Sequence, residues 1–148
     1  MKKILLLNGP NLNRLGKREP EIYGHTTLKE LETKLKEKAE GKGYQLLSAQ
    51  SNHEGELIDH IHKAEDEGYE GIILNPGAYT HYSYALRDGV ASVSVPVVEI
   101  HISNIHQRES FRHHSVIAAE TIGQIVGMGL YGYELAMDAI INYIQGRV

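Results

Sequence analysis

Near the start of the chain stands Ile4-Leu5-Leu6-Leu7, a continuous apolar run that Asn8-Gly9-Pro10 stops. A run without polar alternation is typical of a strand that is buried on both faces. Such strands occur mainly in parallel sheets that helices cover on both sides. The run therefore favours an α/β fold, and we expect further strands and helices to follow it.

Strands and helices are expected to alternate along the rest of the chain. Thr27 and Glu30 have the spacing of a capping box, which predicts where the first helix begins, and Gly41 and Gly43 predict its end. Ser51-Asn52 is a candidate cap for the second helix. Further strands are predicted at residues 44–49, 71–74, 95–102 and 124–126, and further helices at residues 83–91, 115–121 and 130–145.

The order of these elements predicts the architecture. Strands that alternate with helices pair in parallel through right-handed crossovers. Five such units in 148 residues predict a three-layer, flavodoxin-like α/β fold with a five-stranded parallel sheet of order 2-1-3-4-5. This length suits one domain with a substantial core, so we expect residues 1–148 to form a single domain.

Composition excludes several classes of protein. The chain has no cysteine, which rules out disulfides and thiolate catalysis. The formal net charge is −4 and no basic stripe stands out, which argues against nucleic acid as the main partner. No apolar run approaches the roughly 18 residues of a membrane helix, and the first residues lack a signal-peptide pattern. We therefore expect a soluble cytoplasmic protein.

The segment Leu15–Gly24 is predicted to be a loop, because glycines bracket it and Pro20 interrupts it. It carries Arg18 and Tyr23. An arginine beside a phenol favours the ionised phenolate, so a mobile loop with this pair is able to close over a ligand and present a base. Taken alone, the segment is equally compatible with a surface turn in which Tyr23 packs and Arg18 is solvated.

Polar residues gather where the predicted strands end. In this fold, ligands bind beyond the carboxyl ends of the strands, near the switch point between strands 1 and 3. Histidine exchanges protons near neutral pH, and arginine suits a carboxylate or a cluster of hydroxyls. The set predicts a pocket for a small, polyoxygenated, anionic ligand. Its members are Asn8, Asn11, Arg18, Tyr23, Asn75, His81, Glu99, His101, Ser103 and Arg112.

Other motifs are missing or weak. The loop after strand 1 lacks the Gly-x-Gly-x-x-Gly of dinucleotide sites and the Gly-Lys-Ser/Thr of P-loops. No Gly-x-Ser-x-Gly motif suggests a serine nucleophile. His101, His106, His113 and His114 are candidate zinc ligands, but no helical His-x-x-x-His pair supports them. A metal-dependent hydrolase remains a rival interpretation.

Several separate motifs, in register over nearly the whole chain, resemble the type II 3-dehydroquinate dehydratases. Motifs in this number and order are far more specific than any one of them alone. They are Asn8-Gly9-Pro10-Asn11-Leu12, Arg18-Glu19-Pro20, Tyr23-Gly24, Asn75-Pro76-Gly77-Ala78, Thr80-His81, Leu86-Arg87-Asp88, Glu99-Ile100-His101-Ile102-Ser103-Asn104 and Arg108-Glu109-Ser110-Phe111-Arg112-His113-His114-Ser115.

The resemblance implies a single catalytic domain and a specific chemistry. Members of this family convert 3-dehydroquinate to 3-dehydroshikimate by anti elimination through an enolate, without a metal or organic cofactor. Carried over, Tyr23 is the base, and Arg18 keeps it ionised. Asn11 helps to hold a water molecule that stabilises the enolate, and His101 protonates the departing hydroxyl. Glu99 orients or charges His101.

The resemblance also implies how the substrate is bound. Asn75, Ile102 and Ser103 are expected to bind the substrate carboxylate and nearby oxygens. His81 and Arg112 are expected to hold ring hydroxyls. The pathway is the shikimate route to aromatic amino acids, with quinate breakdown as the alternative.

A homo-oligomer follows from the same resemblance. The family assembles as a dodecamer of four trimers, in which Asp88 reaches the site of a neighbouring subunit. Neither a membrane nor nucleic acid is expected as a partner. A non-catalytic module that binds a small anion is the alternative from another functional class, and Tyr23 distinguishes it from an enzyme.

Overall fold

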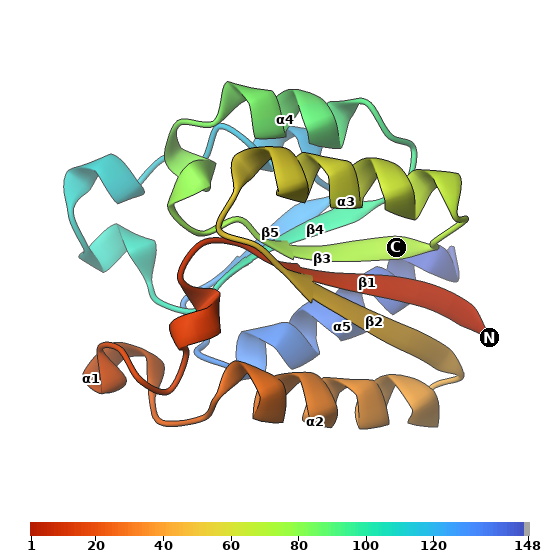
Figure 1. The fold of residues 1–148 in the computed structure, drawn as a ribbon, viewed down its shortest axis with the longest axis horizontal. Coiled ribbons are helices and arrows are strands. Elements are labelled where there is room, and N and C mark those ends of the chain that lie inside the picture. The colour runs from red at the N-terminus through yellow and green to blue at the C-terminus, as the bar shows by residue number, and fades with distance from the viewer. Residues whose placement is uncertain (147–148) are drawn as a thin grey trace.

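Five parallel strands form one sheet in the order β2-β1-β3-β4-β5, which confirms the predicted α/β fold and strand order (Figure 1). The computed structural model describes residues 1–146, so the last two residues of the expected domain, 147–148, lie outside the described range. The strands are β1 (Lys2–Asn8), β2 (Tyr44–Gln50), β3 (Gly71–Asn75), β4 (Val97–His101) and β5 (Gly123–Val126).

Helices cover both faces of the sheet. Figure 1 shows α2 and α5 on one face and α3 and α4 on the other, whereas α1 is a single turn between β1 and α2. Within residues 1–146, no helix is long and apolar enough to cross a membrane. The helices are α1 (Pro20–Tyr23), α2 (Leu28–Gly41), α3 (Glu54–Asp66), α4 (Tyr84–Ala91) and α5 (Tyr131–Ile144).

The position of β1 inside the sheet explains its unbroken apolar run. Ile4 and Leu6 face the core beneath α2 and α5, whereas Leu5 and Leu7 face the core beneath α3 and α4. All four side chains are at most 6% exposed. Since successive side chains of a strand point to opposite faces, a strand that is covered on both sides needs an apolar residue at every position.

β1 and β3 end side by side. Asn8 is the register partner of Asn75, and the N–H of Gly9 donates to the Asn75 carbonyl at 2.7 Å. A Cβ at Gly9 would lie 2.8 Å from the carbonyl oxygen of Pro76, which is closer than packed atoms approach. Glycine therefore lets the chain leave β1 directly over the end of β3, and polar groups from both strands meet there.

Helix capping agrees with the sequence at one helix and differs at the next. In α2, Thr27 Oγ1 accepts from the Glu30 N–H at 3.2 Å, and both halves of the predicted capping box are present. At α3 the predicted Ser51-Asn52 cap is wrong, because the N-cap is His53. The Ser51 hydroxyl instead accepts from the His53 N–H at 2.9 Å, so it stabilises the turn that precedes the helix.

The helix predicted at residues 115–121 is also wrong, since only Ala118–Glu120 forms a single 3₁₀ turn. The Ser115 hydroxyl accepts from the N–H groups of Ile117 and Ala118, and it thereby satisfies the backbone of a turn that does not continue as a helix. β4 begins at Val97 rather than at residue 95, because a proline precedes it and has no N–H to pair.

Candidate active site

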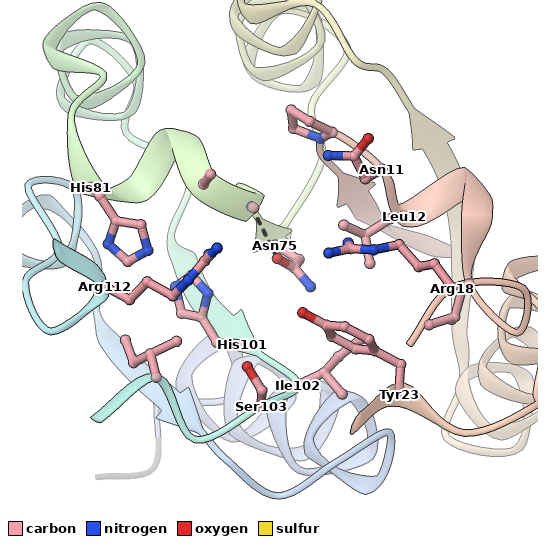
Figure 2. Close-up of a pocket in the computed structure, with 15 residues that line it drawn as sticks. Asn11, Leu12, Arg18, Tyr23, Asn75, His81, His101, Ile102, Ser103 and Arg112 are labelled. Atoms are coloured by element: carbon pink, nitrogen blue, oxygen red, sulfur yellow. Dashed lines mark hydrogen bonds between the residues drawn. The ribbon is translucent and has the colours of Figure 1, made fainter. Parts of the chain in front are cut away.

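A cavity opens at the carboxyl ends of β1, β3 and β4, where the fold rule places it (Figure 2). It collects residues from the carboxyl ends of β3 and β4 and from the segments that follow β1, β3 and β4. All of the predicted site residues except Asn8, Glu99 and Asp88 line it. The lining members of the predicted set are Asn11, Arg18, Tyr23, Asn75, His81, His101, Ile102, Ser103 and Arg112.

One wall is the loop that follows β1, and a set of amide side chains holds it. Asn11 has a left-handed backbone with φ of 71°, a conformation that asparagine tolerates better than most residues. Its N–H donates to Asn52 Oδ1 at 3.0 Å. Gln50 Nε2 donates both to the Gly9 carbonyl and to Asn52 Oδ1, each at 3.1 Å. The end of β2 therefore fixes the position of Asn11.

The opposite wall carries Tyr23, which α1 presents to the cavity. Its hydroxyl accepts a hydrogen bond from Arg108 Nη1 at 2.9 Å. The Arg18 guanidinium lies over the tyrosine ring, 5.0 Å from the ring centroid, and pairs with Glu19 at 2.7 Å. The predicted proximity of Arg18 and Tyr23 is thus confirmed, but the arginine that reaches the phenol oxygen is Arg108.

The floor of the cavity contains a buried pair, Glu99 and His101, whose side chains share one face of β4. His101 Nε2 lies 2.5 Å from Glu99 Oε2, and the glutamate is fully buried. Burial by itself raises the pKa of Glu99. Hydrogen bonds from His101, Thr80 and Gln124, together with the charge of His101, outweigh burial and hold that pKa below its usual range. Because Nε2 faces the carboxylate, Nδ1 is the nitrogen left to exchange a proton with a ligand.

Asn75 is oriented by a chain of hydrogen bonds that runs away from the cavity. Its Oδ1 accepts from the Gly77 N–H at 3.1 Å, so its Nδ2 must be the atom that donates to the Tyr133 hydroxyl at 2.9 Å. Tyr133 in turn donates to Asn8 Oδ1 at 2.7 Å. With Oδ1 and one amide hydrogen engaged, Asn75 offers a donor to the cavity, which suits a carboxylate oxygen.

His81 lies beside His101, with ring centroids 6.4 Å apart and nearly parallel ring planes (Figure 2). Burial lowers the pKa of His81, although a hydrogen bond to the His114 carbonyl opposes that effect, and the positive charges of His101 and Arg112 lower the pKa further. His81 Nδ1 donates to that carbonyl at 2.9 Å, because a carbonyl accepts only. Neutral His81 therefore presents Nε2 as an acceptor, which suits a ligand hydroxyl.

Comparison with known proteins assigns this arrangement to a family. The family described as Dehydroquinase class II matches residues 2–141. The chain belongs to this family. The predicted resemblance to the type II 3-dehydroquinate dehydratases is therefore confirmed.

Relatives of this class II dehydroquinase agree in sequence and in structure. A 3-dehydroquinate dehydratase of Bacillus cereus (strain G9842) is 64% identical over 146 residues, which span 99% of each chain. The crystal structure of the type II dehydroquinase of Butyrivibrio crossotus matches with a TM-score of 0.92 and 51% identity, and it covers 95% of this chain and 97% of its own. That of Propionibacterium acnes matches with a TM-score of 0.91 and 43% identity, covering 98% and 97%.

Two predicted residues of the class II dehydroquinase site do not line the cavity. Glu99 lies behind His101 and contacts its Nε2, and its expected supporting role stays a prediction. Asp88 lies exposed on α4, and its expected role across a subunit interface stays a prediction. The zinc interpretation finds no support in residues 1–146, where no group of three or more histidine, cysteine, aspartate or glutamate residues is arranged to hold a metal ion.

The sequence did not reveal two residues that contact site residues far from them in the chain. Arg108 is separated from Tyr23 by 85 positions, and Tyr133 from Asn75 by 58. The motif that contains Arg108 was visible in the sequence, but the direction of its side chain was not. Nothing in the sequence pointed to Tyr133 as a site residue, because a tyrosine on an apolar helix is usually a packing residue.

Proposed function

We infer that this class II dehydroquinase is a hydro-lyase of the shikimate pathway, which converts 3-dehydroquinate to 3-dehydroshikimate and water. The observation that supports this most strongly is the pairing of two proton-transfer groups across one cavity. One is Tyr23, whose oxygen accepts from an arginine, and the other is His101, which is backed by a buried carboxylate. Curated relatives that match 98–99% of this chain bear the name 3-dehydroquinate dehydratase.

Tyr23 takes the proton from the carbon beside the substrate ketone. A phenol acts as a base only when it is ionised, and cations near it favour the ionised form. Arg108 donates directly to the phenol oxygen, and Arg18 places a second cation over the ring. The electron pair of the broken C–H bond moves toward the ketone and gives an enolate. Asn11 holds a water molecule that donates to the enolate oxygen.

His101 completes the elimination. The enolate expels the hydroxyl group, and His101 gives it a proton, so that it leaves as water. Glu99 stabilises the imidazolium that must be present beforehand. Figure 2 shows Tyr23 and His101 entering the cavity from different walls, which suits an anti elimination, where base and acid act on opposite faces of the ring.

The remaining lining residues bind the substrate. Asn75, with Ile102 and Ser103, binds the carboxylate, for which the donor orientation of the Asn75 amide is suited. His81 accepts from a ring hydroxyl, and Arg112 donates to one. All chemistry in this scheme is carried by side chains and water, so no metal or organic cofactor takes part in it.

We propose that the protein acts in the cytoplasm as a dodecamer of four trimers, with residues 1–148 as one catalytic domain. One feature of α4 supports a role for Asp88 between subunits. Asp88 follows Tyr84 by four positions, so both lie on one side of the helix, and Tyr84 is 67% exposed. Large aromatic side chains are enriched on surfaces that another chain covers, so the exposed Tyr84 places Asp88 beside a candidate interface residue.

The direct test is to add 3-dehydroquinate to the purified protein in the presence of a chelator. We expect ultraviolet absorbance to rise as the conjugated enone product forms, and we expect exhaustive chelation to leave the rate unchanged. A sample without protein is the control. Absence of the enone product would contradict the proposed function. Activity that is lost on chelation and returns when zinc is added would favour the metal-dependent hydrolase.

The two arginines near Tyr23 are expected to contribute unequally. In Arg108→Gln we expect turnover to fall about tenfold or more, and the low-pH limb of the kcat profile to move to higher pH, because the phenolate loses its charged donor. Arg18→Gln should lower turnover with a smaller displacement of that limb, since Arg18 contacts the ring face. Steady-state kinetics between pH 5 and 10, on both variants, make the comparison. An unmoved limb in Arg108→Gln would mean that Arg108 only binds substrate or shapes the loop.

A further inference from the structure

Two hydroxyl groups, one fully buried and one half-buried, contact the carboxylate that supports His101. Thr80 Oγ1 lies 2.5 Å from Glu99 Oε2, and Ser115 Oγ lies 3.0 Å from each carboxylate oxygen. The two hydroxyl oxygens are themselves 2.8 Å apart. Thr80 is fully buried, and neither hydroxyl residue is among those that line the cavity. These residues therefore act on the site without touching a ligand.

The direction of each hydrogen bond can be derived from the partners. Ser115 Oγ already accepts from the N–H groups of Ile117 and Ala118, at 3.2 and 2.9 Å. Its oxygen has no acceptor capacity left, so its one hydrogen points to Glu99. Thr80 must then point its own hydrogen to Glu99 as well, since Ser115 cannot accept it. A protonated Glu99 would lose one of these donors, so the arrangement favours the ionised carboxylate.

Hydrogen bonds of neighbouring groups join the two segments that carry Thr80 and Ser115. The Thr80 carbonyl accepts from the Val116 N–H at 2.8 Å, and His81 Nδ1 donates to the His114 carbonyl at 2.9 Å. Residues 114–116 thus run beside the turn that follows β3. Thr80 belongs to a 3₁₀ helix (Gly77–His81) whose position is tied at its end to the loop that carries Arg112.

We propose that Thr80 and Ser115 form a hydroxyl clamp that holds Glu99 ionised and in place, so that His101 keeps the proton which it gives to the departing hydroxyl. The clamp residues are positioning residues, and their role rests on the proposed function. The other charged or titratable groups on the cavity side of the Glu99–His101 pair are His81, Arg112, Tyr23 and Arg18. None of them contacts the Glu99 carboxylate, among the contacts of residues 1–146. Gln124 adds a further hydrogen bond to Glu99, which substitutions of Thr80 and Ser115 leave in place.

The test compares Thr80→Val, which removes the hydroxyl with little change of shape, with Thr80→Ser, which retains it. For Thr80→Val we expect kcat to fall about tenfold and KM to change less than about twofold. We also expect the high-pH limb of kcat to move to lower pH, because an acid without a firmly held anion beside it loses its proton more readily. Thr80→Ser should keep the parent profile. A mere loss of folded protein would scale the profile without moving it.

Ser115→Ala provides a second variant at a half-buried position, and it decides the case if Thr80→Val does not fold. It should move the limb in the same direction. Thr121→Val is the matched control, because the Thr121 hydroxyl donates to backbone carbonyls and lies outside the cavity and the clamp. The pH profile of Thr121→Val should match that of the parent. Parent-like profiles in the clamp variants of an active enzyme, or equal losses in Thr80→Val and Thr80→Ser, would overturn the clamp alone. An inactive parent protein would overturn the proposed function and the clamp with it.

Discussion

Tyr23→Phe is expected to fold as the parent does and to lose about 10³-fold in turnover, since general bases commonly contribute 10²–10⁴-fold. The change deletes the atom that takes the proton and leaves the ring, which packs partly against the core, in place. Arg108 loses its acceptor but keeps its contact with Ser103, so the loop that contains it retains one of its anchors. The loss should fall on kcat much more than on KM.

Steady-state kinetics and a thermal unfolding curve measure this prediction. Tyr143→Phe is the matched control, because it removes the same atom from an exposed tyrosine on α5, and its kinetics should equal those of the parent. Binding of the product, followed by calorimetry, should survive in Tyr23→Phe. Substantial dehydration by a folded Tyr23→Phe protein would contradict the assignment of the base and would leave Tyr23 as a packing residue.

His101→Asn is expected to lower kcat by about 10²–10³-fold, because the departing hydroxyl loses its proton donor. It should also lower the free energy of unfolding at neutral pH, since Glu99 is fully buried and loses its closest cationic partner. Both effects arise because the substitution removes His101 from its pair with Glu99. Kinetics with 3-dehydroquinate and denaturant unfolding at several pH values measure them.

The pH dependence of stability has a definite sign in this variant. In the parent the pKa of Glu99 is lowered by folding, so Glu99 contributes stability above its unfolded pKa of about 4.3 and loses that contribution as pH falls through the lower folded value. Without His101, burial is less opposed and the folded pKa rises. His101→Asn should therefore lose less stability than the parent as pH falls below the unfolded pKa of about 4.3. Parallel stability curves for the two proteins would show that His101 does not hold the charge of Glu99.

Much of the fold was predictable because its signals are local. The apolar residues of β1 and the turn residues after it indicate burial and chain reversal within a few positions. The alternation of strands and helices then implies parallel pairing, which allows only a few strand orders. The helix expected at residues 115–121 failed for a tertiary reason. Ser115 serves both Glu99 and its own turn, and a window of neighbouring residues contains neither requirement.

The residues that line the candidate site were predictable from the sequence, whereas the residues that orient them were not. Tyr23 and Asn75 follow predicted strands and His101 lies near the end of another, so the rule that ligands bind at the carboxyl ends of the strands groups them in one pocket. Their orienting partners come from segments far away in the chain, among them Arg108 for the phenol and Tyr133 for the amide. Whether a side chain turns toward such a partner depends on packing geometry, which spacing in the sequence does not encode.

The close approach at Gly9 has a consequence for which ligands the enzyme accepts. Gly9 leaves no room between the end of β1 and the Pro76 backbone, so the distance between the Asn11 loop and Asn75 cannot shrink or widen with the ligand. Any larger side chain at Gly9 would place its Cβ 2.8 Å from the carbonyl oxygen of Pro76, so the two backbone segments would have to move apart. The backbone therefore sets the spacing of these two groups, and we expect adjustment to different substrates to fall on the segment that carries Arg18 and Tyr23.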